Sequence, residues 1–130
     1  PVPRCEIHAL RARWDFPMAI QAWRPVASPL LLVRALPPAC HSISPGVNMA
    51  GPSLAGLAAR TEKLLSSGDY KGKAKDLAGY IRESTIEPSA HLVPGPMYSA
   101  QGVSFMPTTY AKDLTSTQID ELAAYLSSLK

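Results

Sequence analysis

The clearest pattern of apolar and polar positions lies at the carboxyl end of the sequence. Thr115 and Gln118 have the spacing of a capping box, in which each side chain bonds the backbone N–H of the other residue. Apolar residues then recur at intervals of three and four, the spacing of one helix face: Ile119, Leu122, Ala123, Leu126 and Leu129. We therefore predict an amphipathic helix that begins after Thr115 and packs on a core.

Two segments upstream have the same helical periodicity. The first extends from Ser53 to about Ser66 and ends before Gly68, a residue suited to a helix stop. The second extends from Ala74 to about Thr85 and ends before Glu87-Pro88, since a residue that precedes proline disfavours helical geometry. The pattern predicts an all-α fold.

The interval from residue 88 to residue 110 has little periodicity and is rich in proline, glycine, serine and tyrosine. An irregular loop of this length inside a small domain is usually functional or disordered. We expect a functional loop in which Tyr98, Phe105 and Tyr110 line a pocket. Ordinary aromatic packing is the alternative.

Length and composition fit one small domain. The chain has 130 residues, of which 46% are hydrophobic. Residues 1–39 contain several prolines and no glycine, which disfavours a long unbroken helix there. We interpret residues 1–36 as an atypical extension, either a docking segment or a reading-frame slip in the recorded sequence, and residues 37–130 as the domain. Cys5 is expected to be a free thiol.

Charge is unevenly distributed along the chain. Residues 1–39 hold five arginines and two acidic residues, whereas residues 40–130 hold eight basic and eight acidic residues. The neutral second part lacks the basic surface of a nucleic-acid-binding protein. Lys71, Lys73 and Lys75 form a basic cluster, interpreted as a solvated face or as a contact for an acidic partner. No apolar run reaches the roughly twenty residues that span a membrane.

The most specific chemistry lies in Cys40 and His41, together with Met106 far downstream. A cysteine can bond a haem vinyl group, the next histidine can bind the iron, and a methionine can bind it from the other side. Pro52 offers a carbonyl on a rigid backbone to the second ring nitrogen of the histidine. Pro37 occupies the first cysteine position of the Cys-x-x-Cys-His motif, so a single thioether is expected.

Other residues compete for the distal position. Met97 is the main rival of Met106, because both lie in the same turn-rich interval. Met106 is preferred, since a proline and then a helix follow it. Met18 and Met49 are disfavoured by their places in the chain, and His91 is interpreted as a surface loop histidine.

From His41 onward the sequence resembles the class I cytochrome c family. The resemblance is carried by Cys40-His41-Ser42, by residues 46–57, by Val103-Ser104-Phe105-Met106-Pro107 and by residues 114–130. It implies an all-α class I cytochrome c fold around one covalently bound haem c. The axial iron ligands implied are His41 and Met106. The implied cofactor-binding residues are Cys40, His41, Pro52, Leu54, Tyr98, Phe105 and Met106.

The function that this resemblance implies is single-electron transfer by a carrier without a catalytic residue of its own. Residues 70–96 and 102–107 look similar to monohaem subunits of alternative complex III, a bacterial membrane assembly that oxidises quinol. This similarity implies a periplasmic location at the membrane, a multihaem cytochrome among the partner subunits, and a soluble redox acceptor. A freely diffusing periplasmic cytochrome and a haem-free helical interaction domain are the alternatives.

Overall fold

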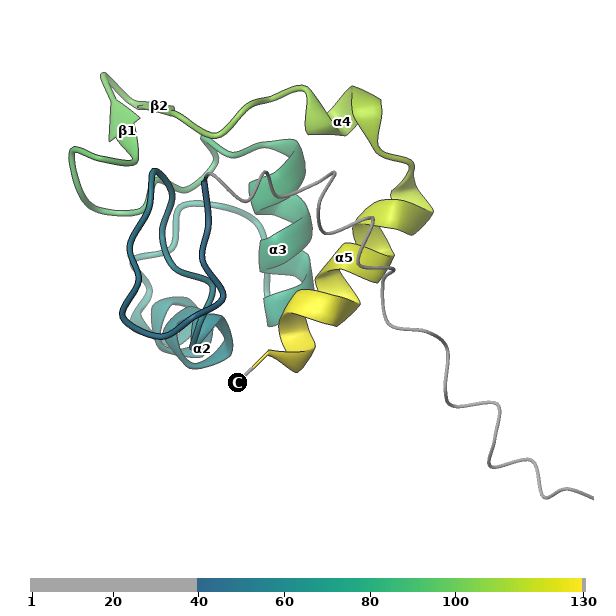
Figure 1. Ribbon diagram of the computed structural model, residues 1–130, viewed down its shortest axis with the longest axis horizontal. Coiled ribbons are helices and arrows are strands. Elements are labelled where there is room, and N and C mark those ends of the chain that lie inside the picture. Colours follow the sequence, from purple (N-terminus) through teal and green to yellow (C-terminus); the bar gives the residue numbers. More distant parts are fainter. Residues whose placement is uncertain (1–39, 130) are drawn as a thin grey trace, which may run out of the picture.

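The computed structural model describes residues 40–129, and most of their regular structure is helical (Figure 1). The elements are α2 (Leu57–Ser67), α3 (Leu77–Ile86), β1 (Ser99–Ala100), β2 (Val103–Ser104), α4 (Tyr110–Asp113) and α5 (Ser116–Ser128). This architecture is compatible with the predicted all-α class. The expectations for residues 1–36, Pro37, Cys5 and Met18 lie outside the described residues.

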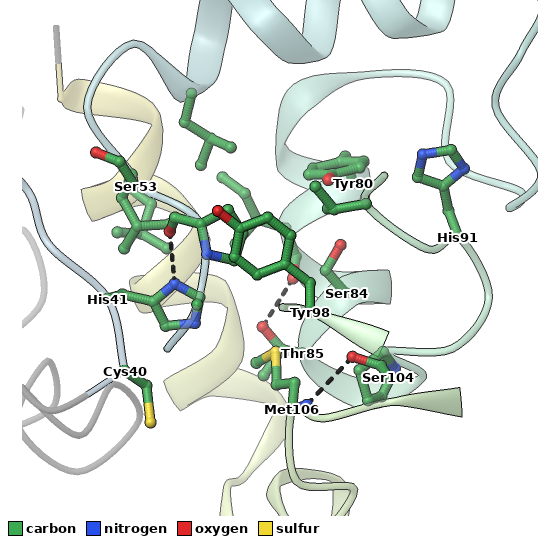
Figure 2. Close-up of a pocket in the computed structure, with 18 of the residues that line it drawn as sticks. Cys40, His41, Ser53, Tyr80, Ser84, Thr85, His91, Tyr98, Ser104 and Met106 are labelled. Carbon is green, nitrogen blue, oxygen red and sulfur yellow. Dashed lines mark hydrogen bonds between the residues drawn. The ribbon is translucent and has the colours of Figure 1, made fainter. Parts of the chain in front are cut away.

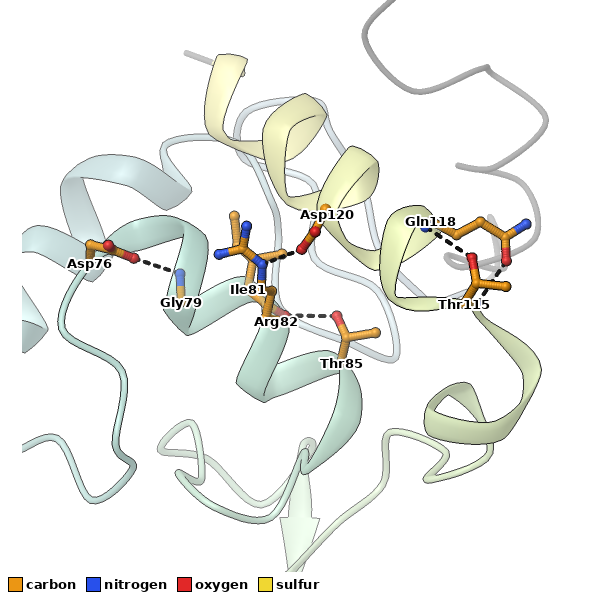
Figure 3. A network of polar contacts seen from close by, with 8 residues as sticks. All are labelled: Asp76, Gly79, Ile81, Arg82, Thr85, Thr115, Gln118 and Asp120. Carbon is orange, nitrogen blue, oxygen red and sulfur yellow. Dashed lines mark hydrogen bonds and ion pairs between the residues drawn. The ribbon is translucent and has the colours of Figure 1, made fainter.

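The predicted terminal helix is confirmed as α5. The Thr115 hydroxyl accepts a hydrogen bond from the Gln118 N–H at 3.2 Å, and the Gln118 side chain accepts one from the Thr115 N–H at 2.9 Å, as drawn in Figure 3. The predicted apolar face is buried at Ile119, Leu122, Ala123 and Leu126. The capping box therefore fixes the start of the helix, and burial of its apolar face fixes the orientation.

Both upstream helices begin three or four residues later than predicted. Gly56 has a φ of 66°, a left-handed conformation that prevents α2 from starting at Ser53, and Gly68 ends α2 as predicted with a φ of 79°. In α3 the Asp76 carboxylate accepts a hydrogen bond from the Gly79 N–H at 2.6 Å (Figure 3). An aspartate in that role marks the residue before a helix, which moves the start from Ala74 to Leu77.

The hydrophobic core lies where α3 packs against α5 and where α2 contacts both. Arg82 on α3 and Asp120 on α5 add an exposed ion pair at 2.6 Å (Figure 3). The core consists of side chains from all the longer helices and from the segments beside them: Leu54, Leu57, Ile81, Tyr110, Leu114, Ile119, Leu122, Ala123 and Leu126. The described residues contain no helix that combines the length and apolar character needed to cross a membrane.

The interval predicted as an irregular loop contains a short antiparallel hairpin. Ala100 pairs with Val103 and Ser99 pairs with Ser104, and the turn between them uses positive φ angles at Gln101 and Gly102. Two-residue strands are too short to show a period of two in the sequence, so the pattern did not reveal them. The hairpin is followed by α4, which leads the chain back toward α5 (Figure 1).

Candidate functional site

A cavity of about 310 Å³ lies between α2, α3, α5, Tyr110 of α4 and two further segments, residues 40–56 and 88–109. Its lining is largely apolar. All seven residues that the sequence singled out as cofactor-binding line this cavity: Cys40, His41, Pro52, Leu54, Tyr98, Phe105 and Met106. Figure 2 shows the side chains of His41 and Met106, from segments far apart in the chain, around the same space. Tertiary structure thus brings the whole candidate set together.

The first irregular segment holds the His41 imidazole in a fixed orientation. His41 Nδ1 lies 2.8 Å from the carbonyl oxygen of Pro52, and because a carbonyl can only accept, Nδ1 carries the proton (Figure 2). The Nε2 atom is then the nitrogen with a free lone pair. The predicted contact between His41 and Pro52 is present in the structure.

Backbone hydrogen bonds close this segment on itself. The Gly51 N–H donates to the Cys40 carbonyl at 2.5 Å, and the Leu54 N–H donates to the Ser42 carbonyl at 2.8 Å. Leu54 is buried in the core, so the segment is anchored at its far end as well. These bonds hold Cys40 and Pro52 at fixed places on either side of the imidazole.

Gly51 has a steric role that sequence reasoning did not assign to it. A Cβ atom at this position would lie 2.5 Å from Cε1 and 2.8 Å from Nδ1 of His41, and 2.8 Å from the Cys40 carbonyl oxygen. No side chain fits at such distances, so the ring packs directly on the Gly51 backbone. Gly51-Pro52 in the sequence is the available signal, since glycine permits a close approach that other residues prevent.

Arg60 on α2 also lines the cavity and was missed by sequence reasoning. Its guanidinium donates hydrogen bonds to the carbonyl oxygens of Ser53 and Ala55. Both carbonyls follow Pro52 within three residues. Arg60 therefore ties the first turn of α2 to the segment that orients His41.

The hairpin carries Met106 to the other side of the cavity. Phe105 N–H donates to the Tyr98 carbonyl at 2.9 Å, which extends the strand pairing by one residue. Met106 N–H donates to the Ser104 hydroxyl at 3.2 Å (Figure 2), and Ser104 N–H donates to the Ser89 hydroxyl at 3.1 Å. Met106 is half-buried and packs against the core cluster. The hairpin is thereby fastened to the chain just after α3.

The rival methionines occupy different positions. Met97 is 60% exposed and does not line the cavity, and Met49 does not line it either. Of the described methionines, Met106 is the one in the cavity wall. The geometry therefore favours Met106 over Met97 for the distal role, which stays a prediction.

His91 differs from its interpretation as a surface loop histidine, because it is half-buried and lines the cavity. Its Nδ1 accepts a hydrogen bond from the Lys71 N–H at 3.3 Å, and its ring packs against Tyr70 with centroids 5.0 Å apart. Burial, followed by the positive charge of Lys71, holds the pKa of His91 below its ordinary value. The neutral imidazole is thus the form that joins the two loops.

Several polar groups on α2 and α3 line the cavity without having been predicted. Thr61 and Thr85 are buried polar residues at core-facing positions, and the Thr85 hydroxyl donates to the Ile81 carbonyl at 2.7 Å (Figure 2). Burial raises the pKa of Tyr80. Polar residues on the core side of a helical pattern are the signal that could have revealed them.

Tyr110, predicted as a possible pocket residue, is buried and lines the cavity. Burial, followed by the nearby Cys40 sulfur, raises the pKa of its hydroxyl. The tyrosine hydroxyl therefore stays protonated over the physiological range and is available as a hydrogen-bond donor near Cys40.

The basic cluster lies outside the cavity, on the loop between α2 and α3. Lys71, Lys73 and Lys75 are exposed and do not line the cavity. Glu83 on α3 anchors this loop, because its carboxylate accepts hydrogen bonds from the Tyr70 hydroxyl and from the Lys73 N–H, the latter at 2.8 Å. Burial alone would raise the pKa of Glu83, but these bonds lower it. The interpretation as a solvated face agrees with this exposure.

Comparison with family models, curated proteins and solved structures returned no match. Within residues 40–129, no three histidine, cysteine or acidic side chains gather in the manner of a metal site built from those residue types. The functional argument therefore rests on the geometry of the cavity and on the chemistry of its lining.

Proposed function

We propose that this protein is a small c-type cytochrome that binds one haem c and transfers single electrons. The observation that carries the proposal is the convergence of Cys40, His41 and Met106 on one largely apolar cavity. Cys40 and His41 are adjacent in the sequence, whereas Met106 lies more than sixty positions further along. A thiol, an imidazole and a thioether are the groups that hold a haem covalently and bind its iron on both sides.

The residues present fit this cofactor in three respects. The lining is apolar, as a porphyrin requires, and the imidazole carries its proton on Nδ1, which leaves Nε2 free to bind iron. Gly51 leaves no room for a side chain beside the ring, so the ring orientation is set before any ligand binds. Metal-binding histidines normally donate their second ring N–H to such an acceptor, and His41 has this arrangement.

Each residue has a distinct task in this proposal. Cys40 would hold the haem through a thioether bond, and Nε2 of His41 and the Met106 thioether would bind its iron. The Pro52 carbonyl fixes the imidazole and increases its basicity. Haem bound in this way supplies the one-electron change between ferrous and ferric iron. Two filled axial positions leave no place for a substrate, which favours an electron carrier over a peroxidase.

The finer proposal is a class I cytochrome c fold in a subunit of a membrane quinol-oxidising complex on the periplasmic side. The support for the fold is the resemblance from His41 onward, and the support for the complex is the narrower similarity of residues 70–96 and 102–107. A multihaem cytochrome in the same complex would donate electrons, and a soluble protein would accept them. A freely diffusing periplasmic cytochrome would use the same site. Gel filtration of the soluble fraction, compared with extraction from membranes, distinguishes the free cytochrome from the complex subunit.

Acid–acetone extraction of the purified full chain, followed by the alkaline pyridine spectrum of the protein fraction, tests the cofactor. We expect haem to resist extraction, because a thioether to Cys40 is covalent. The spectrum should have the band position of a haem with one saturated vinyl group, since one thioether saturates one vinyl. A freshly isolated protein without colour would contradict the proposal and would favour the alternative interpretation, a haem-free helical domain.

The distal ligand is tested by a matched pair of variants, Met106→Ala and Met97→Ala. A thioether ligand favours ferrous iron, so we expect Met106→Ala to lower the reduction potential and to allow added imidazole to bind the ferric form. Met97→Ala, at an exposed position outside the cavity, should change neither property. The reverse result would assign the distal role to Met97.

A further inference from the structure

The outer face of the hairpin exposes apolar side chains. Val103 is 59% exposed and Phe105 is 58% exposed, whereas Ser104 and Met106, which alternate with them, are half-buried. Residues two apart on a strand share one face, so the strand that turns Met106 inward turns Val103 and Phe105 outward. Met97, 60% exposed, lies two residues before β1, in the segment that leads into the hairpin. We call Met97, Val103 and Phe105 the hairpin patch.

The two loop segments that line the cavity carry no charged residue. Lysine, arginine, aspartate and glutamate are all absent from residues 40–59 and from residues 88–111. The charged residues among residues 40–129 therefore lie on α2, α3, α4, α5, the loop before α3 and Glu87, directly after α3. Loops at a protein surface are usually polar or charged, so an exposed apolar patch inside an uncharged segment marks a binding surface.

We infer that the hairpin patch is the docking surface for a redox partner protein whose own contact face is apolar and uncharged. The inference rests on the proposed function, since Phe105 belongs both to the patch and to the cavity wall next to Met106. A partner protein bound to the patch would contact Phe105, and the same side chain would then be all that separates the partner from the cavity. The Lys71, Lys73 and Lys75 cluster, which lies outside the cavity lining, has no part in this contact.

The size of the patch favours a transient partner protein over a second copy of the chain. A stable dimer buries about 800 Å² on each subunit, whereas electron-transfer encounters bury less. Val103 and Phe105 at one short hairpin, with Met97 in the segment before it, match the smaller class. A lipid surface is disfavoured as well, because peripheral membrane binding normally adds lysine or arginine beside the apolar residues, and residues 88–111 contain neither.

The test uses the holoprotein on gold electrodes coated with methyl-terminated or carboxylate-terminated alkanethiol monolayers. We expect voltammetric electron transfer on the methyl-terminated surface that does not change as potassium chloride is raised, since no ion pair is involved. Val103→Asp should lower the adsorbed electroactive protein about tenfold, as expected for loss of one buried apolar side chain. Phe105→Ser provides a second variant with the same expectation and without an added charge.

Ile86→Asp is the matched control. Ile86 is 39% exposed, lies at the end of α3 and does not line the cavity, so the same added charge should leave adsorption unchanged. An equal loss in this variant, or electron transfer that prefers the carboxylate surface and falls with salt, would overturn the inference. The latter result would assign docking to the lysine cluster.

Two further measurements test the alternative occupants of the patch, which are a second copy of the chain and a lipid surface. Sedimentation velocity that gave a dimer dispersed by Val103→Asp would identify a second copy as the occupant, and flotation with neutral phosphatidylcholine vesicles would identify a lipid surface. Either result overturns the inference. Adsorbed protein that gives no voltammetric wave would count against the proposed function instead, and adsorbed mass on a quartz microbalance would still compare Val103→Asp with Ile86→Asp.

Discussion

At the scale of single residues, the environment of His41 is set by groups that do not themselves bind a ligand. The Pro52 carbonyl fixes the tautomer, the Gly51 backbone supports the ring, and Arg60 ties down the carbonyls that follow. A histidine held on two sides loses little rotational freedom when a metal binds. The conformational entropy needed to orient the imidazole is therefore lost during folding and not during binding.

Gly51→Ala tests this support. We expect the substitution to lower the free energy of unfolding by about 1–3 kcal/mol and to weaken haem retention, because a methyl group would overlap the His41 ring. Chemical denaturation with a haem-absorbance readout measures both effects. Gly79→Ala is the control, since alanine is favoured inside a helix and the nearest atom lies 3.0 Å away on the Asp76 side chain. Equal losses in the two variants would contradict the steric role of Gly51.

His91 gives a pH dependence whose sign follows from its lowered pKa. A histidine whose folded-state pKa is depressed contributes stability above its unfolded pKa of about 6.5, and this contribution is lost as the pH falls through the folded value. Protonated Nδ1 also cannot accept the bond from Lys71. Urea midpoints measured above and below that pH should fall on acidification in the native protein and fall less in His91→Gln. An identical fall in both would assign the effect to other groups.

At the scale of elements, the hairpin shows how two paired residues on each strand determine which side chains meet the cavity. The period of two turns Ser104 and Met106 toward the cavity and leaves Val103 exposed outside it, and a slip of one residue would exchange them. Positive φ angles at Gln101 and Gly102 fix the turn, and the bond from Ser104 N–H to Ser89 fixes the hairpin to the body of the domain. Register here is set by these local bonds more than by strand length.

The capping box of α5 is the element with the most direct stability prediction. Thr115→Ala removes the acceptor for the Gln118 N–H, and we expect it to lower the free energy of unfolding by about 1 kcal/mol, as measured by urea denaturation. Ser116→Ala, one residue along at an exposed position with no capping bond, should have almost no effect. If both variants unfold alike, the cap does not stabilise α5 in solution.

At the scale of the whole molecule, the packing of α3 on α5 forms one wall of the cavity as well as the core. Ile81 on α3 and Leu122 and Leu126 on α5 belong to the core cluster and also line the cavity. The stability of the domain and the shape of its site therefore depend on the same side chains.

Leu122→Ala should reveal this coupling. Leu122 is 1% exposed, and we expect its truncation to lower the free energy of unfolding by about 2–5 kcal/mol. Because the same side chain lines the cavity, haem affinity or the visible spectrum should change as well. Leu65→Ala, at a half-buried position on α2 outside this cavity, is expected to cost less and to leave the spectrum unchanged. Equal spectral changes in the two variants would contradict the conclusion that the core and the cavity share the Leu122 side chain.

The sequence alone determined the helices with strong periodicity and clear end signals, because capping and amphipathic spacing act within a few residues. It also identified Cys40, His41, Pro52 and Met106 as candidates, since their chemistry belongs to the residue types. The tertiary structure alone decided that Met106 and not Met97 lines the cavity and that His91 lines it together with His41, and it added Gly51 and Arg60 to the site. Their roles depend on contacts with residues elsewhere in the fold, and such distances are fixed when the core packs.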